Sequence, residues 1–238
     1  MVSVSPVYLA GGGDPAWVTV PLHRACGWSH GNDPLQPRVL LSSPDQKALL
    51  RLEPRADGPW WTIQHARTAD HPAWSARFDA RTPVEVIAAF TDALTSPSQP
   101  AVTPDPFEPL REARWPKPEI DRRRLSPDGL VRINDHPNWE IRTALPMEPI
   151  WRADLDRTTP PHLVTILTTA LASRTPLLRR PDQVPHLARD RMALTARDIP
   201  AEALASALED RVRALAAHRA AHTAPARPRP STGHGRTR

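Results

Sequence analysis

The residues that most resemble a site for chemistry stand near the beginning of the chain. His23, Cys26 and His30 follow the spacing His-x2-Cys-x3-His, and imidazole nitrogens and thiolate sulfur are ligands that zinc prefers. A structural zinc site needs four ligands, and no fourth is evident nearby in the sequence. We therefore interpret these residues as an unliganded cysteine and two ordinary histidines, and the sequence predicts neither a metal nor another cofactor.

Other patterns that support catalysis are missing from the sequence. It contains no Ser–His–Asp arrangement, no His-Glu-x-x-His motif and no nucleotide-binding fingerprint. The glycines at 11–13 lack the Gly-Lys-Ser/Thr ending of a phosphate loop, and we interpret them as a turn before a strand at 17–20. Asp45 and Asp128 each follow Ser-Pro, which predicts carboxylates that hydrogen-bond the local backbone of a turn. These patterns indicate a protein that is not an enzyme.

Arginines provide the second candidate for chemistry, because they bind phosphate groups. The chain has a net charge of +5, and nearly all of the excess lies in the last residues of the chain, not on a folded basic face. One internal basic cluster also stands out, although Glu112, Glu119 and Asp121 lie close to it in the sequence. The candidate nucleic-acid-binding residues from this cluster and the tail are Arg122, Arg123, Arg124, Arg227 and Arg229.

A duplication determines which elements must position these residues. The segment Trp74–Pro83 recurs as Trp151–Pro160 with Trp, Ala, Asp, Thr and Pro at matching places, and Ser43-Pro44-Asp45 recurs as Ser126-Pro127-Asp128. A repeated sequence pattern marks a repeated supersecondary unit. The chain is therefore expected to contain two related lobes, which a pseudo-twofold axis would relate.

Each copy reads as a run of strands that ends in a helix. In the first copy, Trp74, Ala76 and Phe78 alternate with polar residues, the pattern of a half-buried antiparallel strand. Thr82, Pro83 and Glu85 then predict a capped helix start with Pro at the first helical position. Thr159 and Pro160 repeat this start in the second copy.

The tryptophans separate into core residues and one exception. Trp61, Trp139, Trp74 and Trp151 recur at equivalent positions and alternate in phase with apolar neighbours, so we expect them in the core. Trp60 has the opposite phase, and Asn138 stands at its place in the second copy. An exposed aromatic side chain is suited to contact a partner, so Trp60 is the candidate partner-binding residue.

Composition completes the domain plan. The chain of 238 residues contains 30 Pro and one Cys, which excludes an internal disulfide. No apolar run is long enough to span a membrane, and no signal peptide is visible, so the expected location is the cytoplasm. We expect a first repeat with an N-terminal extension (1–96), a Pro-rich linker without regular structure (97–121), a second repeat (122–176), a C-terminal helical region (177–222) and a disordered basic tail (223–238).

The paired Ser-Pro-Asp turns, the strands that carry Trp and the Thr-Pro helix starts resemble the SPDY-type domain of unknown function, a family of actinomycete proteins. The opening Tyr8-Leu9-Ala10-Gly11-Gly12-Gly13-Asp14-Pro15 is also similar to the beginning of its members. The aromatic fourth position of the motif is absent, since Gln46 and Gly129 stand there. The resemblance implies a fold in two tandem copies, and it implies no catalytic residue.

The sequence thus predicts an α+β protein with two tandem antiparallel sheet-plus-helix repeats, each a β-meander followed by a helix, a C-terminal helix and a disordered tail. Such an object is suited to binding. We expect a non-catalytic binding or adaptor protein whose partner is another protein. The alternative is a nucleic-acid-binding accessory protein that uses the Arg-rich linker and tail on DNA or RNA. Partner identity, biological process and oligomeric state stay open, as do whether the repeats share one sheet and whether His23, Cys26 and His30 bind a metal.

Overall fold

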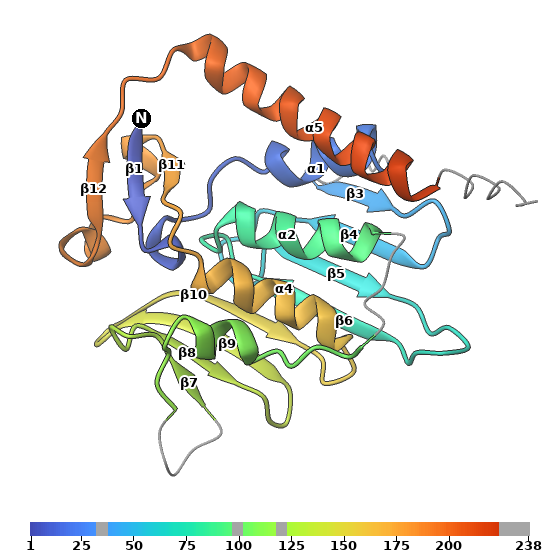
Figure 1. Ribbon diagram of the computed structural model, residues 1–238, viewed down its shortest axis with the longest axis horizontal. Coiled ribbons are helices and arrows are strands. Elements are labelled where there is room, and N and C mark those ends of the chain that lie inside the picture. Colours follow the sequence, from blue (N-terminus) through green and yellow to red (C-terminus); the bar gives the residue numbers. More distant parts are fainter. Residues whose placement is uncertain (32–37, 97–101, 118–122, 224–238) are drawn as a thin grey trace, which may run out of the picture.

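A nine-stranded antiparallel sheet is the centre of the fold in the computed structural model, which describes residues 1–31, 38–96, 102–117 and 123–223. This arrangement confirms the predicted α+β class (Figure 1). In spatial order the strands are β2 (Ser29–Gly31), β3 (Val39–Ser42), β4 (Ala48–Leu52), β5 (Trp61–His65), β6 (Trp74–Phe78), β10 (Glu148–Leu155), β9 (Trp139–Leu145), β8 (Val131–Asn134) and β7 (Arg124–Leu125).

The two repeats share this one sheet, because the last strand of each repeat pairs with the last strand of the other. Strands β6 and β10 run antiparallel, with Phe78 opposite Ala153, Arg77 opposite Asp154 and Ala76 opposite Leu155. Arg77 and Asp154 occupy equivalent positions in the two copies. The pairing is therefore symmetric about this residue pair, which marks a local pseudo-twofold axis at the seam between the repeats.

Helices lie on one side of the sheet. They are α1 (Ala16–Arg24), α2 (Val84–Thr95), α3 (Glu108–Glu112), α4 (Pro161–Ala172) and α5 (Ala201–Thr223). The equivalent helices α2 and α4 pack side by side, α3 packs on α4, and α5 crosses α1 (Figure 1). Among the described residues, no helix is both long and apolar enough to cross a membrane.

The alternation in the strands places the expected residues in the core between sheet and helices. Trp61, Trp74 and Trp151 are each at most 3% exposed, which confirms their predicted burial. Trp74 meets the ring of Phe90 on α2 edge to face at 6.0 Å. Trp139 is half-buried and lies against Phe107, with ring centroids 5.4 Å apart.

The predicted capping of the two repeated helices is wrong. Helix α2 begins at Val84 with Pro83 at the N-cap, helix α4 begins at Pro161 with Pro160 at the N-cap, and neither N-cap makes a side-chain bond. Thr82 and Thr159 are buried instead, and each donates its backbone N–H within the preceding turn. The Thr-Pro pair sets the helix start one residue later than expected, because the prolines keep an extended ψ.

The prediction of a strand at 17–20 is also wrong, because these residues belong to α1. The Asp14 side chain accepts a hydrogen bond from the Ala16 N–H at the helix start. Val18 and Leu22, one helical turn apart, are buried. Burial at this spacing outweighs the β-propensity of the Val-Thr-Val run.

The linker contains regular structure, contrary to expectation. Helix α3 lies within 97–121, Leu110 and Trp115 are buried, and the Thr168 hydroxyl on α4 donates to the Pro106 carbonyl at 2.7 Å. Apolar side chains at this spacing fix the segment on α4 in spite of its prolines.

The region after α4 is not wholly helical. Strands β11 (Leu177–Arg179) and β12 (Ala193–Ala196) flank β1 (Val2–Ser5) in a second, three-stranded antiparallel sheet. Short 3-10 helices occupy Val7–Leu9, Pro181–Gln183 and His186–Arg191. The predicted helix from Ile199 onward is confirmed as α5. The N-terminal extension and the C-terminal region, which lie at opposite ends of the sequence, thus form this second sheet together.

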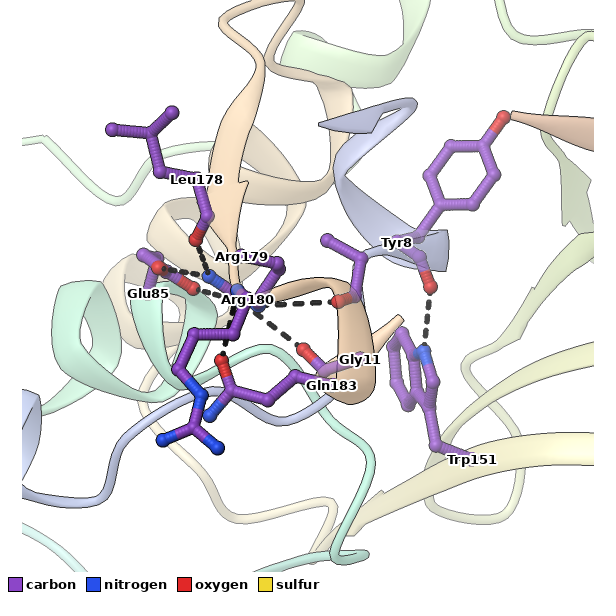
Figure 2. Close-up of polar contacts among 9 residues, drawn as sticks. Tyr8, Gly11, Glu85, Trp151, Leu178, Arg179, Arg180 and Gln183 are labelled. Carbon is purple, nitrogen blue, oxygen red and sulfur yellow. Dashed lines mark hydrogen bonds and ion pairs between the residues drawn. The ribbon is translucent and has the colours of Figure 1, made fainter. Parts of the chain in front are cut away.

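A buried arginine fastens this second sheet to the repeats (Figure 2). The Arg179 guanidinium is held by both carboxylate oxygens of Glu85 on α2, at 2.7 and 2.6 Å. It also donates to the carbonyls of Ala10, Gly11 and Leu178 at 2.8 to 3.1 Å. Because burial of a charge is costly unless it is paired and hydrogen-bonded, this complete set of acceptors is what allows Arg179 to be 2% exposed.

Candidate functional site

The face of the sheet opposite the helices carries three arginines in a row. Arg132, Arg142 and Arg152 lie directly opposite one another on β8, β9 and β10, and all three are exposed. We call them the arginine ladder. Neighbouring strands are about 4.8 Å apart, so the backbones of these three arginines lie within about 10 Å of one another. Like charges directly opposite each other on a sheet destabilise it, which makes this arrangement unusual for a purely structural surface.

Two carboxylates neutralise part of the ladder. Glu140 contacts Arg142 at 2.7 Å and Arg152 at 2.9 Å, and Asp154 contacts Arg152 at 2.6 Å. Desolvation raises the pKa of Glu140, but the hydrogen bond and charge of Arg142 and the charge of Arg152 outweigh it, so its pKa lies below the usual value. Arg132 makes no ion pair with any described residue, so the ladder keeps a positive excess.

The first repeat contributes further residues to the same face. Arg77, exposed on β6, lies next to Asp154 across the seam. Trp61 is opposite Phe78, so a continuation of this register by one residue places Trp60 beside Asp79. The Asp79 carboxylate accepts a hydrogen bond from the Arg152 backbone N–H at 2.9 Å. The row from Trp60 through Asp79 therefore leads directly to the arginine ladder.

Trp60 itself is half-buried. Its indole Nε1–H donates to the Arg55 carbonyl at 2.9 Å, and its ring packs on the edge of the core. It is therefore less exposed than its phase in the sequence predicts. Its role in partner binding stays a prediction.

The structure separates the other predicted arginines. Arg122, Arg227 and Arg229 lie outside the described residues. Arg123 is half-buried just before β7. Arg124 is 9% exposed, and its guanidinium lies over the Phe107 ring at 4.9 Å, a cation–π contact that holds α3 to the sheet. A role for Arg124 in phosphate binding would require it to leave this position.

The three residues with zinc-like spacing do not gather into one site. The Cys26 thiol is buried 3.7 Å from the Thr95 hydroxyl, His23 Nδ1 lies 2.8 Å from the Trp28 carbonyl oxygen, and His30 is exposed on β2. In the described ranges, no group of three or more His, Cys, Asp or Glu side chains is placed to hold a metal ion.

The two Ser-Pro-Asp segments form the predicted turns. Asp45 accepts from the Ser43 hydroxyl and the Lys47 N–H, and Asp128 accepts from the Ser126 hydroxyl and the Leu130 N–H. The copies differ on the outer side of the turn. There the Tyr8 hydroxyl donates to Asp128 Oδ2 at 2.8 Å, whereas Asp45 faces two neighbouring clefts of about 340 and 290 Å³.

A third cleft, of about 320 Å³, lies between the β9–β10 hairpin and the segment after β11. Leu145, Ile150 and Val184 contribute apolar atoms to its wall, and Arg81, Glu148 and Asp182 lie at its polar side. None of these residues was singled out from the sequence. The cleft brings together segments that are far apart in the chain, so no local pattern could reveal it.

Sequence reasoning also missed the arginine ladder, although a signal was present. Arg132, Arg142 and Arg152 each alternate with buried residues of a predicted strand. This alternation indicates that each side chain points away from the core. The register that aligns the three arginines depends on long-range pairing, and the sequence alone does not supply it. The expectation located the excess charge in the tail and did not anticipate this cluster of arginines on the folded sheet.

Comparison with known proteins agrees with the duplicated architecture. The model of the SPDY family, a domain of unknown function (DUF317), matches residues 42–100 and 125–177. These segments contain the strands β4–β6 with α2 and the strands β8–β10 with α4. No curated protein and no solved structure matches the chain. The chain therefore carries the SPDY domain, a domain of unknown function, in two tandem copies.

Proposed function

We propose that this protein is a non-catalytic binding or adaptor protein that docks a partner protein on the open face of its sheet. The observation that carries the proposal is the arginine ladder, which stands exposed beside Arg77 on a broad surface. Arginine and tryptophan are enriched at the energetic centres of protein interfaces. Trp60 lies at the end of the same row of residues, so both types are available on one face.

The mixture of charges supports a protein as the partner. Glu140 and Asp154 lie between the arginines and would repel a continuous phosphate backbone. A partner protein with acidic groups opposite the arginines and basic or neutral groups opposite the carboxylates complements this pattern. Electrostatic complementarity of this kind sets the orientation and the rate of docking.

Nucleic acid is the second candidate partner, because the arginines of the ladder can bind its phosphate groups. Three aligned guanidinium groups are suited to hydrogen-bond phosphate oxygens in pairs. In this case the arginines of the folded sheet would bind the nucleic acid, in place of the Arg-rich linker and tail that the sequence suggested. This second candidate predicts a steep loss of affinity with salt, because bound phosphates release their counterions.

The experiment compares the full chain with a variant that carries Arg132→Gln, Arg142→Gln and Arg152→Gln. A control variant carries Arg67→Gln, Arg157→Gln and Arg174→Gln, exposed positions outside the ladder with the same loss of charge. Each protein is used to capture partners from a nuclease-treated lysate of its source cells. Each is also titrated with labelled single- and double-stranded DNA and RNA at about 50 and 200 mM salt.

A protein that the wild type and the control capture, and the ladder variant does not, supports the proposal. Salt-sensitive nucleic-acid binding that is lost only in the ladder variant would favour the second candidate. Equal behaviour of the wild type and the ladder variant in both assays would refute the open face as the docking surface. Circular dichroism of all three proteins verifies that the substitutions leave the fold intact.

A further inference from the structure

In the second repeat, the N-terminal segment of the chain fills a groove. The Tyr8 hydroxyl donates to Asp128 of the Ser-Pro-Asp turn at 2.8 Å. The Trp151 indole Nε1–H donates to the Tyr8 backbone carbonyl at 2.8 Å (Figure 2). Tyr8 is 6% exposed, and Trp115 meets its ring edge to face at 6.0 Å. Tyr8 thus hydrogen-bonds both Asp128 and Trp151, and each of these residues has a counterpart in the first repeat.

The residues that follow Tyr8 continue along this groove. The Gly12 carbonyl accepts a hydrogen bond from the Val84 N–H at 2.7 Å, at the beginning of α2. Gly13 lies against Val84 and Arg179, and an added Cβ atom there would approach a Val84 methyl group to 2.9 Å. Glycine, with a φ of 85° at position 13, therefore permits the segment to pass close to the helix. Nearby, Glu85 holds Arg179.

The first repeat has the equivalent aspartate and tryptophan around an open cleft, with a histidine at the place of Glu85. Asp45 is the counterpart of Asp128, Trp74 of Trp151 and His162 of Glu85, since the pseudo-twofold axis exchanges the two helix starts. All three counterparts line the cleft of about 340 Å³. No described segment of the chain plays the role of Tyr8 there.

The groups that bind Tyr8 in the second repeat are available in this cleft. The Asp45 side chain is 58% exposed, and outside its own turn its only described contact is with Lys47, 3.8 Å away. The Trp74 indole N–H makes no hydrogen bond with any described residue. Burial lowers the pKa of His162, and the nearby His71 lowers it further, which favours the neutral imidazole.

We propose that this cleft, the first-repeat cleft, binds a tyrosine in a segment of a partner protein that adopts a short 3-10 turn there, as Val7–Leu9 does in the second repeat. The phenol hydroxyl donates to Asp45, and the backbone carbonyl of the same tyrosine accepts from the Trp74 indole. Small residues follow the tyrosine, as they do after Tyr8. The single tyrosine of this chain is buried in its own groove, so a second copy of the protein does not supply the ligand. The site is separate from the open face of the proposed function.

The probe is a fluorescein-labelled peptide with the sequence of residues 7–13, Val-Tyr-Leu-Ala-Gly-Gly-Gly. Fluorescence anisotropy measures its binding to the full chain, and a second peptide with Phe in place of Tyr tests the hydroxyl. The protein variants are Asp45→Asn, Asp128→Asn and the control Asp57→Asn, an exposed loop position. We expect Asp45→Asn and the Phe peptide each to weaken binding about tenfold, the usual effect of losing a hydrogen bond to a charged group, and Asp57→Asn to leave it unchanged.

Three results would overturn the proposal. The first is no saturable binding at millimolar peptide, and the second is equal binding of the Tyr and Phe peptides. The third is binding that depends on Asp128 and not on Asp45, since the peptide would then displace the chain's own segment from the second repeat. The comparison of two peptides requires no protein variant, so it stays informative even if a substitution disturbs the fold.

Discussion

Asp79 and Asp156 occupy equivalent positions in the two repeats, and each binds the backbone of the other repeat. Asp79 accepts a hydrogen bond from the Arg152 N–H at 2.9 Å, and Asp156 accepts one from the Ser75 N–H at 2.7 Å. Their own backbone N–H groups donate in return to the carbonyls of Arg152 and Ser75, at 3.0 and 2.9 Å. The two carboxylates therefore close both ends of the seam between β6 and β10.

Replacement of these aspartates is expected to weaken the seam unequally. Asp156→Ala should lower the free energy of unfolding by about 2 kcal/mol, because its charged oxygen accepts from both the N–H and the hydroxyl of Ser75. Asp79→Ala should cost less, because burial raises the pKa of Asp79 and its ionised form is partly destabilised in the fold. Urea denaturation measures both values. Asp57→Ala, in an exposed loop, should change stability by less than about 0.5 kcal/mol, and an equal effect of all three substitutions would contradict the role of the seam.

Arg179 is expected to be among the most sensitive positions in the chain. Arg179→Ala leaves Glu85 without its bidentate partner and should cost about 3 to 5 kcal/mol. Arg179→Lys should not restore stability. An ammonium group has three donors at one nitrogen, whereas the planar guanidinium group donates to two carboxylate oxygens and three carbonyls at once. Thermal and chemical denaturation measure the loss. Recovery of wild-type stability by lysine would show that charge alone, without the geometry of the guanidinium, is sufficient.

The arginine ladder should reduce stability slightly. Arg132→Gln is expected to leave the free energy of unfolding unchanged or to raise it by up to about 1 kcal/mol, since it removes a charge directly opposite Arg142. Arg142→Gln should be less favourable, because it also removes the contact with Glu140. Urea titration at low and high salt checks this order. A large loss of stability in Arg132→Gln would mean that the ladder has a structural role.

The contribution of Glu140 should depend on pH in a defined direction. Its pKa is lowered from 4.5 in the folded protein, so its ion pairs stabilise the fold above that value and are lost as pH falls through the folded pKa. The stability difference between the wild type and Glu140→Gln should therefore be constant near neutral pH and shrink below about pH 4.5. Denaturation curves across this range test the sign. A difference that grew on acidification would contradict the lowered pKa.

Cys26 should resist chemical modification in the folded protein. Burial raises the pKa of its thiol, which reduces the reactive thiolate at neutral pH, and the residue is 2% exposed. Reaction with a thiol reagent should therefore be slow in buffer and fast in urea. A mass spectrum at several times measures both rates. Rapid labelling without denaturant would show that the cleft of about 290 Å³, which Cys26 and Trp28 line, opens readily.

The sequence predicts local elements well where a single periodicity dominates. Trp74, Ala76 and Phe78 alternate with polar residues, and both the strand and its buried face are confirmed. Helix α1 was missed because Val18 and Val20 favour strands, while burial on the sheet, a tertiary effect, favours a helix. The helix starts were misplaced by one residue, because Thr82 and Thr159 look like caps but are buried.

Features that depend on long-range pairing could not be predicted from the sequence, for a different reason. The duplication predicted related lobes, but only the pairing of β6 with β10 shows that they share one sheet. The arginine ladder depends on the registers of β8, β9 and β10, and the first-repeat cleft depends on comparing two grooves in space. Each of these relationships joins residues that no local pattern connects.

The symmetric pairing of β6 with β10 has a consequence for the origin of the chain. Each strand offers the other the same set of donors and acceptors, as two identical subunits do in an isologous dimer. A polypeptide with one repeat could therefore pair the backbone donors and acceptors at both ends of this strand by forming a homodimer. Gene duplication and fusion of such a homodimer would keep the interface and place both halves in one chain. The two halves of such a fused chain could then differ, as they do here, where Tyr8 occupies the groove of the second repeat and the cleft of the first is open.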